Sequence, residues 1–221
     1  MILDNLNNYR IILASRSPRR QQLLKELGLK FDVVIREYSE SYPEGLDGEA
    51  IVRYIAHRKA ITFTGELSGN EIVITADTIV WCNNKVLGKP LNYEEAVSIL
   101  KEISGNTHEV ITGVTLFSSF KEITFTASTR VTFDTLSSEE INFYIDKFKP
   151  YDKAGAYGIQ EWIGLVACSG IEGSYFNVVG LPVQKLYKEL KCFILPPCPS
   201  CSPPVHSPGK NGNPELRRGV G

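Results

Sequence analysis

The sequence lacks long apolar runs and has no excess of charge of either sign. No stretch contains the roughly twenty consecutive apolar residues that a membrane-spanning helix needs. Lys and Arg together number 24 and Asp and Glu 25, so the net charge of -1 gives no global signal for binding nucleic acid or a membrane surface. The N-terminus has Asp4 where a signal peptide would carry basic residues and then a longer apolar stretch. We therefore expect a cytoplasmic protein with neither a nucleic-acid nor a membrane partner.

Cysteine is also scarce in most of the chain. The five cysteines stand at positions 82, 168, 192, 198 and 201. An odd number of scattered cysteines does not indicate a disulfide framework. The last two, with His206, are residues of types that bind zinc, but a structural zinc site needs four ligands on a folded loop, and their neighbours are Pro, Ser and Gly. We predict one globular domain over residues 1–191 and a disordered tail rich in Pro, Ser, Gly and Cys over 192–221.

Several common catalytic signatures are absent as well. The chain has no Walker loop ending in Gly-Lys-Ser/Thr, no protein-kinase signature and no nucleophile elbow. Its three histidines, at positions 57, 108 and 206, have no metal-ligand spacing. These absences leave the widespread designs for phosphoryl and acyl transfer without support.

Apolar periodicity predicts strands mixed with helices. Strands are predicted over 11–14, 30–36 and 71–82, as a hairpin within 108–134, and as two short strands after the loop 151–160. Helices are predicted over 18–27, 49–64, 92–104 and 137–148, and a last helix has Pro182 in its first turn. Asn83-Asn84 is predicted to turn the long third strand back on itself. This order predicts an α/β fold with a mixed sheet.

Three arginines, Arg16, Arg19 and Arg20, crowd the turn between the first strand and the helix that follows it. The positive end of a helix dipole prefers carboxylates, so cations there are locally unfavourable. The free N–H groups of a first helical turn, the hydroxyls of Ser15 and Ser17 and these guanidiniums together match a phosphate group. The alternative is a basic turn that is merely solvated.

Asp77 interrupts an otherwise apolar strand, "IVITADTIVW". A charge buried there must be paired, bound to metal or neutralised; the alternative is that Asp77 marks a strand end or a bulge and faces water. Glu40, Lys59 and Lys89 lie near the ends of predicted elements. If they converge with the arginine turn, cations would hold a polyphosphate and carboxylates a divalent metal.

Five segments, taken in order, resemble the Maf family of nucleotide pyrophosphatases. They are "LASRSPRRQQLL", "VITADTIV" with "LGKP", "ISGNTHEVITGV", "DKAGAYGIQ" and "GSYFNVVGLP". The resemblance runs from about Arg10 to Leu190. It implies an inosine-triphosphatase-like, two-lobed α/β fold with a mixed, twisted sheet and a central cleft, usually in a homodimer. The implied reaction is hydrolysis of a nucleoside triphosphate to the monophosphate and pyrophosphate with Mg²⁺ or Mn²⁺.

The resemblance also assigns roles to residues of this chain. The implied phosphate-binding residues are Ser15, Ser17, Arg19, Arg20, Lys59 and Lys89. Asp77 is implied to be the general base and, with Glu40, a metal ligand. Arg19, Thr78 and Gln160 match the positions that mark the branch acting on dTTP and UTP.

Two features separate this chain from the family pattern. Many members carry Asp directly before the loop Glu, whereas this chain has Ser39 before Glu40, which puts one acidic contribution to metal binding in doubt. The tail after Lys191 matches nothing in the family. Two alternatives stay open: a nucleotide-binding regulator of septum formation without catalysis, and a house-cleaning hydrolase for modified pyrimidine nucleotides, which a small pocket would separate poorly from the ordinary ones.

Overall fold

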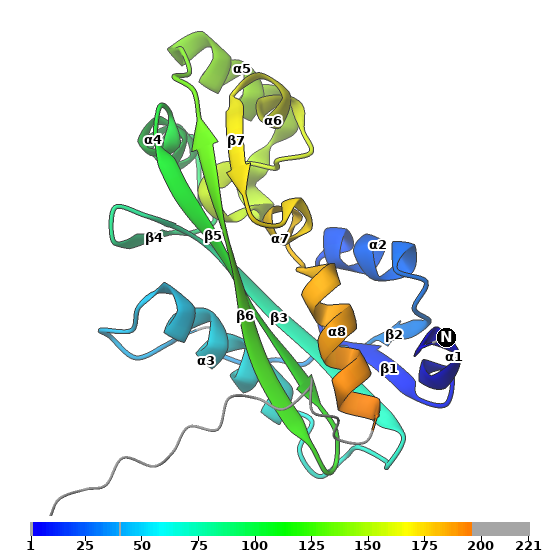
Figure 1. Cartoon of the computed structure of the whole chain (residues 1–221). Coiled ribbons are helices and arrows are strands. Elements are labelled where there is room, and N and C mark those ends of the chain that lie inside the picture. Colours follow the sequence, from blue (N-terminus) through cyan, green and yellow to red (C-terminus); the bar gives the residue numbers. More distant parts are fainter. Residues whose placement is uncertain (1, 40, 196–221) are drawn as a thin grey trace, which may run out of the picture.

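A seven-stranded mixed sheet forms the centre of the computed structural model, which describes residues 2–39 and 41–195 (Figure 1). The strands are β1 (Arg10–Leu13), β2 (Phe31–Val33), β3 (Glu71–Cys82), β4 (Lys85–Leu87), β5 (Thr107–Phe117), β6 (Glu122–Phe133) and β7 (Cys168–Glu172). Their order is β2-β1-β3-β5-β6-β7, with β4 paired to β3. β1 runs parallel to β2 and β3, whereas the other pairs are antiparallel. The predicted mixed α/β class is confirmed.

Eight α-helices and two short 3-10 turns precede, connect or follow these strands within the described residues. They are α1 (Ile2–Leu6), α2 (Pro18–Glu26), α3 (Gly48–Ile61), α4 (Tyr93–Ile103), α5 (Ser138–Phe148), η1 (Pro150–Asp152), η2 (Ala154–Ala156), α6 (Trp162–Val166), α7 (Tyr175–Val179) and α8 (Val183–Ile194). None of the helices in this part of the chain has the length and apolar character that crossing a bilayer requires.

Local sequence signals explain where the long helices begin. The side chains of Ser17, Asp47 and Asn92 cap α2, α3 and α4 by accepting a first-turn N–H. At α5, Ser137 and Glu140 form a capping box in which each side chain binds the other residue's backbone N–H. These starts agree with the sequence predictions. Asn83-Asn84 turns β3 into β4 as predicted, with both residues at positive φ.

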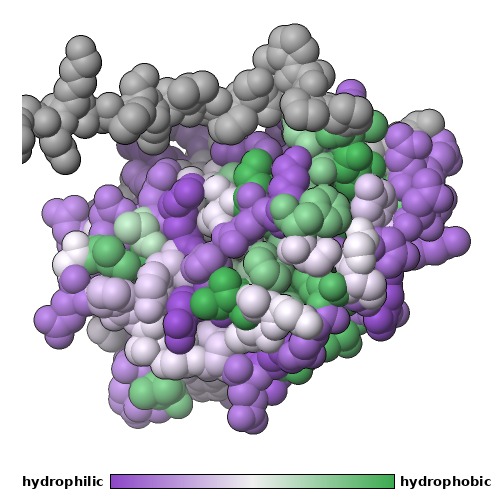
Figure 2. All heavy atoms as spheres, turned by 90° about the horizontal axis from the view of Figure 1, so that it is seen from below, coloured by the Kyte–Doolittle hydropathy of each residue, from purple (hydrophilic) through white to green (hydrophobic). Residues whose placement is uncertain are grey.

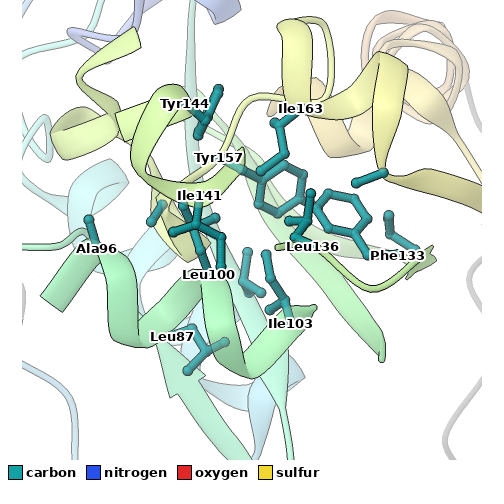
Figure 3. Packing of buried hydrophobic residues seen from close by; sticks show 14 of the residues in the cluster. Leu87, Ala96, Leu100, Ile103, Phe133, Leu136, Ile141, Tyr144, Tyr157 and Ile163 are labelled. Atoms are coloured by element: carbon teal, nitrogen blue, oxygen red, sulfur yellow. The ribbon is translucent and has the colours of Figure 1, made fainter. Parts of the chain in front are cut away.

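The three long strands divide their residues between two cores on one face of the sheet. One core packs the later part of β3, including Val80, against α4, α5 and the 150–167 segment (Figure 3). The other packs the earlier part of β3, including Ala76, against β1, α2 and α8. β5 and β6 likewise contribute Val110 and Val131 to the first core and Val114 and Phe125 to the second. Each long strand therefore runs through both halves of the molecule.

Helix α3 covers the opposite face of the same strands. Ile51, Val52 and Ile55 of α3 pack against Ile79 of β3 and Ile111 of β5. The end of the molecule that Figure 2 shows is largely polar, with hydrophilic residues around smaller groups of apolar ones. This pattern is ordinary for a surface in contact with water.

Three details of the C-terminal half differ from the sequence predictions. Only one of the two predicted short strands forms, β7, because the apolar run in "EWIGLVA" folds as α6 with Ile163 fully buried. A further helix, α7, forms before Gly180. Pro182 lies at the N-cap of α8 rather than inside its first turn.

The last helix continues past the predicted domain boundary at Lys191. α8 ends at Ile194, and Phe193 is buried because the apolar period of Leu186 and Leu190 continues to it. Residues 196–221 of the predicted tail lie outside the described residues, as do Cys198, Cys201 and His206. The limits of the domain and the disorder of the tail stay predictions.

Candidate functional site

A cleft of about 660 Å³ opens beside the middle of β3. β1 pairs with β3 only up to Ile74, and β4 begins to pair at Val80, so one edge of the strand between them has no neighbouring strand. The predicted site residues that line this cleft are Ser15, Ser17, Arg19, Arg20, Lys59, Asp77, Thr78, Lys89 and Gln160. Glu40, the other predicted metal ligand, lies outside the described residues. The gap in the sheet thus brings together residues that are far apart in the sequence.

The backbone carbonyl of Ala76 marks the centre of this open edge. It accepts one hydrogen bond from Nη1 of Arg20 at 2.9 Å and another from Nζ of Lys59 at 3.1 Å. The next two residues, Asp77 and Thr78, point to opposite faces because side chains alternate along a strand. Asp77 lies on the α3 face and Thr78 on the α2 face.

Asp77 forms an ion pair with Lys59 of α3. Oδ1 of Asp77 lies 2.7 Å from Nζ of Lys59, and the two side chains are 19% and 10% exposed. Nζ of Lys59 also lies 5.0 Å from the centre of the Tyr38 ring. Among the described residues nothing hydrogen-bonds to Oδ2 of Asp77. Of the three expectations for a buried charge here (paired, bound to metal or neutralised), the structure shows a paired one. Asp77 marks neither a strand end nor a bulge, since it stands opposite Gly113 in the middle of the β3–β5 ladder.

Gly113 allows α3 to approach the sheet closely enough for this ion pair. A Cβ atom at position 113 would lie 2.4 Å from the carbonyl oxygen of Val52 in α3. No real side chain tolerates that distance to a backbone atom. The glycine therefore sets the height of α3 above β5, and with it the position of Lys59.

Arg20 is held by the protein at four points. Its Nε donates to the carbonyl of Gly180 at 2.8 Å, Nη1 to the carbonyl of Ala76 and to Oγ of Ser15 at 3.3 Å, and Nη2 to Oγ1 of Thr78 at 2.9 Å. Burial of the guanidinium lowers the pKa of Arg20 below its usual value. These contacts describe a clamp between α2, β3 and the end of α7. If Arg20 also contacts a phosphate, as predicted, it must do so with a guanidinium that already makes these four hydrogen bonds.

The other two arginines of the turn differ from each other. Arg19 pairs with Asp152 across the cleft, with Nη1 and Oδ2 2.9 Å apart. Arg16 is exposed and lines the cleft, as does Lys89. No hydrogen bond or ion pair joins Arg16 or Lys89 to the part of the chain that the structure describes. These two cations are free to meet an anion.

Ser15 and Ser17 complete the turn at the start of α2. Oγ of Ser15 accepts from the Ser17 N–H at 3.3 Å, and Oγ of Ser17 accepts from the Arg20 N–H at 3.4 Å. Because each hydroxyl acts there as an acceptor, its own proton remains available to a ligand oxygen.

Part of the cleft lining is apolar. Val80, Val110 and Tyr157 line the cleft there, and all three are almost fully buried. Gln160, three residues after Tyr157, also lines the cleft; it is exposed, and its side-chain amide makes no hydrogen bond within the described ranges. The cleft thus has a cationic part and an apolar part with one amide.

Sequence reasoning missed several residues that line the cleft. Arg36, Tyr38, Asp152 and Lys153 carried no assigned role, although all four belong to it. Asp152 and Lys153 begin "DKAGAYGIQ", a segment that resembles the Maf family. The signal that could have indicated these two cleft residues is an acidic and a basic residue directly before a glycine-containing turn.

Comparisons with known proteins show which family the chain resembles. The family model described as "Maf-like protein" matches residues 10–193. Three similar proteins, each named dTTP/UTP pyrophosphatase, come from Parabacteroides distasonis (51% identity, 87% of this chain and 100% of the relative), Phocaeicola vulgatus (53%, 86% and 99%) and Flavobacterium johnsoniae (49%, 88% and 100%).

Two solved structures align at low scores. The Staphylococcus aureus Ham1 protein has a TM-score of 0.41 and 14% identity over 56% of this chain and 71% of that chain. A nucleoside-triphosphatase (dITP/XTP pyrophosphatase) from Mycobacterium abscessus has a TM-score of 0.38 and 13% identity over 82% of this chain and 93% of that chain. These scores carry no argument about function. The family match covers nearly all of the described residues, and the chain belongs to the Maf-like family.

Proposed function

We propose that this protein hydrolyses nucleoside triphosphates, preferably dTTP and UTP, to the monophosphate and pyrophosphate with a divalent metal. The observation that carries the proposal is the cleft at the open edge of β3. It combines the Asp77–Lys59 pair, the amide of Gln160 and two cations, Arg16 and Lys89, that make no hydrogen bond or ion pair within the described residues. The names of the relatives, at about 50% identity over nearly their whole length, support the choice of substrates.

The cationic part of the cleft matches a triphosphate. Arg16 and Lys89 supply charge without first leaving a partner among residues 2–39 and 41–195, and Ser15 and Ser17 supply hydroxyl protons. The first-turn N–H groups of α2 add donors at the positive end of a helix dipole. Arg19 can join them once its ion pair with Asp152 opens.

A divalent metal is compatible with the donors present. No group of three His, Cys, Asp or Glu in the described ranges could hold a metal ion. Mg²⁺ seldom requires such a cage, because it commonly binds one or two carboxylates together with substrate phosphates and water. Asp77, through its free Oδ2, and Glu40 would hold the ion. Once bound, it would neutralise phosphate charge and make a water molecule a better nucleophile near neutral pH.

We expect Asp77 to take the proton of the attacking water. Lys59 holds one carboxylate oxygen, which orients the other. The water oxygen attacks the α-phosphorus, its proton passes to Asp77, and the bond from the α-phosphorus to the bridging oxygen breaks. Pyrophosphate leaves in line, with Arg16 and Lys89 stabilising the charge that it gains.

The apolar part of the cleft suits a pyrimidine base. The amide of Gln160 offers one donor and one acceptor direction, which matches the N3–H and carbonyl groups of uracil and thymine. Thymine differs from uracil by one methyl group, and an apolar pocket separates ligands that differ by a methyl only weakly. One pocket can therefore serve both dTTP and UTP, and modified uridine triphosphates as well.

Pyrophosphate release from a panel of nucleotides tests the proposal. The panel contains dTTP, UTP, CTP, GTP and 7-methyl-GTP, each with Mg²⁺, with Mn²⁺ and with chelator. We expect release that depends on metal and is fastest with dTTP and UTP. Binding without release from any nucleotide would overturn the proposal in favour of a regulator without catalysis. The homodimer and the cytoplasmic location stay predictions.

A further inference from the structure

Tyr144 of α5 lies outside the cleft, yet its hydroxyl reaches the turn that carries Gln160. The side chain is fully buried in the core that α4 and α5 share, where Figure 3 shows it beside Ile141 and near Tyr157. Burial raises the pKa of the Tyr144 phenol far above its usual value of 10, so this hydroxyl stays protonated. It is a permanent hydrogen-bond donor and acceptor inside an otherwise apolar cluster.

Residues 158–161 form a tight turn with Gln160 at its third position. The Glu161 N–H donates to the carbonyl of Gly158 at 2.9 Å and closes the turn. The Tyr144 hydroxyl accepts from the Gly158 N–H at 3.0 Å and donates to Oε2 of Glu161. One hydroxyl therefore holds the first and the last residue of the turn.

Close packing and ion pairs also restrict the conformation of this turn. A Cβ atom at position 158 would lie 2.8 Å from the carboxyl carbon of Glu161, so the carboxylate packs directly on Gly158. Oε1 of Glu161 also lies 3.1 Å from Nζ of Lys153, whose side chain is 9% exposed. Lys153 in turn lies 2.7 Å from Asp152, the partner of Arg19. Hydrogen bonds and ion pairs thus run without a break from Tyr144 to the arginine turn across the cleft.

We propose that Tyr144, together with Glu161, is a positioning residue that sets base selectivity by fixing the turn that carries Gln160. This inference rests on the proposed function, because it assumes that Gln160 meets the base. The hydroxyl touches neither substrate nor metal. Without it, the Gly158 N–H and the Glu161 carboxylate lose a shared partner, and Gln160 samples orientations that no longer match one base edge.

Tyr144→Phe tests this inference, because it removes one oxygen and keeps the ring in the core. Tyr187→Phe is the matched control: Tyr187 is half-buried on α8, and its hydroxyl makes no hydrogen bond within the described residues. Two ratios of dTTP to CTP are measured: the ratio of the kcat/KM values with metal, and the ratio of the association constants in EDTA. We expect Tyr144→Phe to lower both ratios about tenfold, mainly through KM, and to change kcat for dTTP less than about threefold. The control should leave both ratios unchanged.

Two further comparisons separate positioning from a general loss of structure. In a Gln160→Ala background, Tyr144→Phe should change the ratios by less than about twofold, since residues that act through one another are not additive. Glu161→Gln keeps an acceptor for the hydroxyl and should retain more selectivity than Glu161→Ala. This pair also tests the inference if Tyr144→Phe fails to fold.

The inference is overturned if folded Tyr144→Phe keeps both ratios, if its effect is equal in the Gln160→Ala background, or if the two Glu161 variants behave alike. A wild-type protein that binds nucleotides and releases no pyrophosphate overturns the proposed function instead. The binding ratios still decide the role of Tyr144 in that case.

Discussion

Replacing Arg20 by Lys distinguishes a structural clamp from a simple phosphate contact. Lysine keeps the positive charge, but its single ammonium group cannot reach the carbonyls of Ala76 and Gly180 and the hydroxyls of Ser15 and Thr78 together. We expect about two of the four hydrogen bonds to be lost, at about 1–1.5 kcal/mol each. The free energy of unfolding should therefore fall by about 2–3 kcal/mol.

Arg19→Lys on the same helix is the control for this experiment. Arg19 makes one ion pair, with an Asp152 side chain that is 57% exposed, and such pairs contribute less than about 1 kcal/mol. Urea unfolding followed by tryptophan fluorescence measures both variants, and we expect equal slopes and a clearly lower midpoint for Arg20→Lys alone. Equal midpoints for Arg20→Lys and wild type would refute the clamp and leave Arg20 as a phosphate ligand.

Four other predictions follow from the site and the core. Asp77→Asn should lower pyrophosphate release at least about 100-fold while nucleotide binding stays within a few fold; near wild-type turnover would show that another group is the base. Gln160→Ala should shift base preference more than phosphate affinity, and equal losses for all nucleotides in the panel would contradict that. Gly113→Ala should cost about 1–3 kcal/mol in urea unfolding and slow turnover, because the new methyl group pushes α3 and Lys59 away from the sheet. Gly69→Ala, where a Cβ meets nothing within 4 Å, should change neither. Burial lowers the pKa of His108 from 6.5 to about 4. Between these pH values the imidazole is protonated in the unfolded chain and neutral in the folded one. Stability should therefore be lost as pH falls from about 6.5 to 4, by about 3 kcal/mol at most, and a His108→Asn variant that shows the same loss would exclude this cause.

Local signals predicted much of the fold, because they act within a few residues. A cap such as Ser17 or Asn92 needs only the N–H groups of the turn that follows it, and Asn83-Asn84 needs only a backbone at positive φ. The run "EWIGLVA" was misjudged as a strand because a short apolar stretch suits a buried helix as well as a strand. Its helix is decided by the packing of Ile163, which the sequence does not display.

In the candidate site, too, the sequence predicted what depends on local features but not what depends on tertiary packing. It indicated which types of residue form the site, but not which residues they contact. Arg20 meets Ala76 and Gly180, which are 56 and 160 residues away, and Arg19 meets Asp152 at a separation of 133 residues. Such pairs depend on how β3 passes α2 and the 150–160 segment. Sequence spacing therefore does not predict these long-range contacts.

The long strands impose a mechanical condition on the cleft. Two halves joined by a single flexible linker could close on a ligand like a hinge. Here β3, β5 and β6 run from one half into the other as three hydrogen-bonded strands. Moving the two halves toward each other would therefore require bending a continuous sheet at its middle. We therefore expect the cleft to keep a nearly constant width, with side chains and the turns at its rim adapting to a ligand.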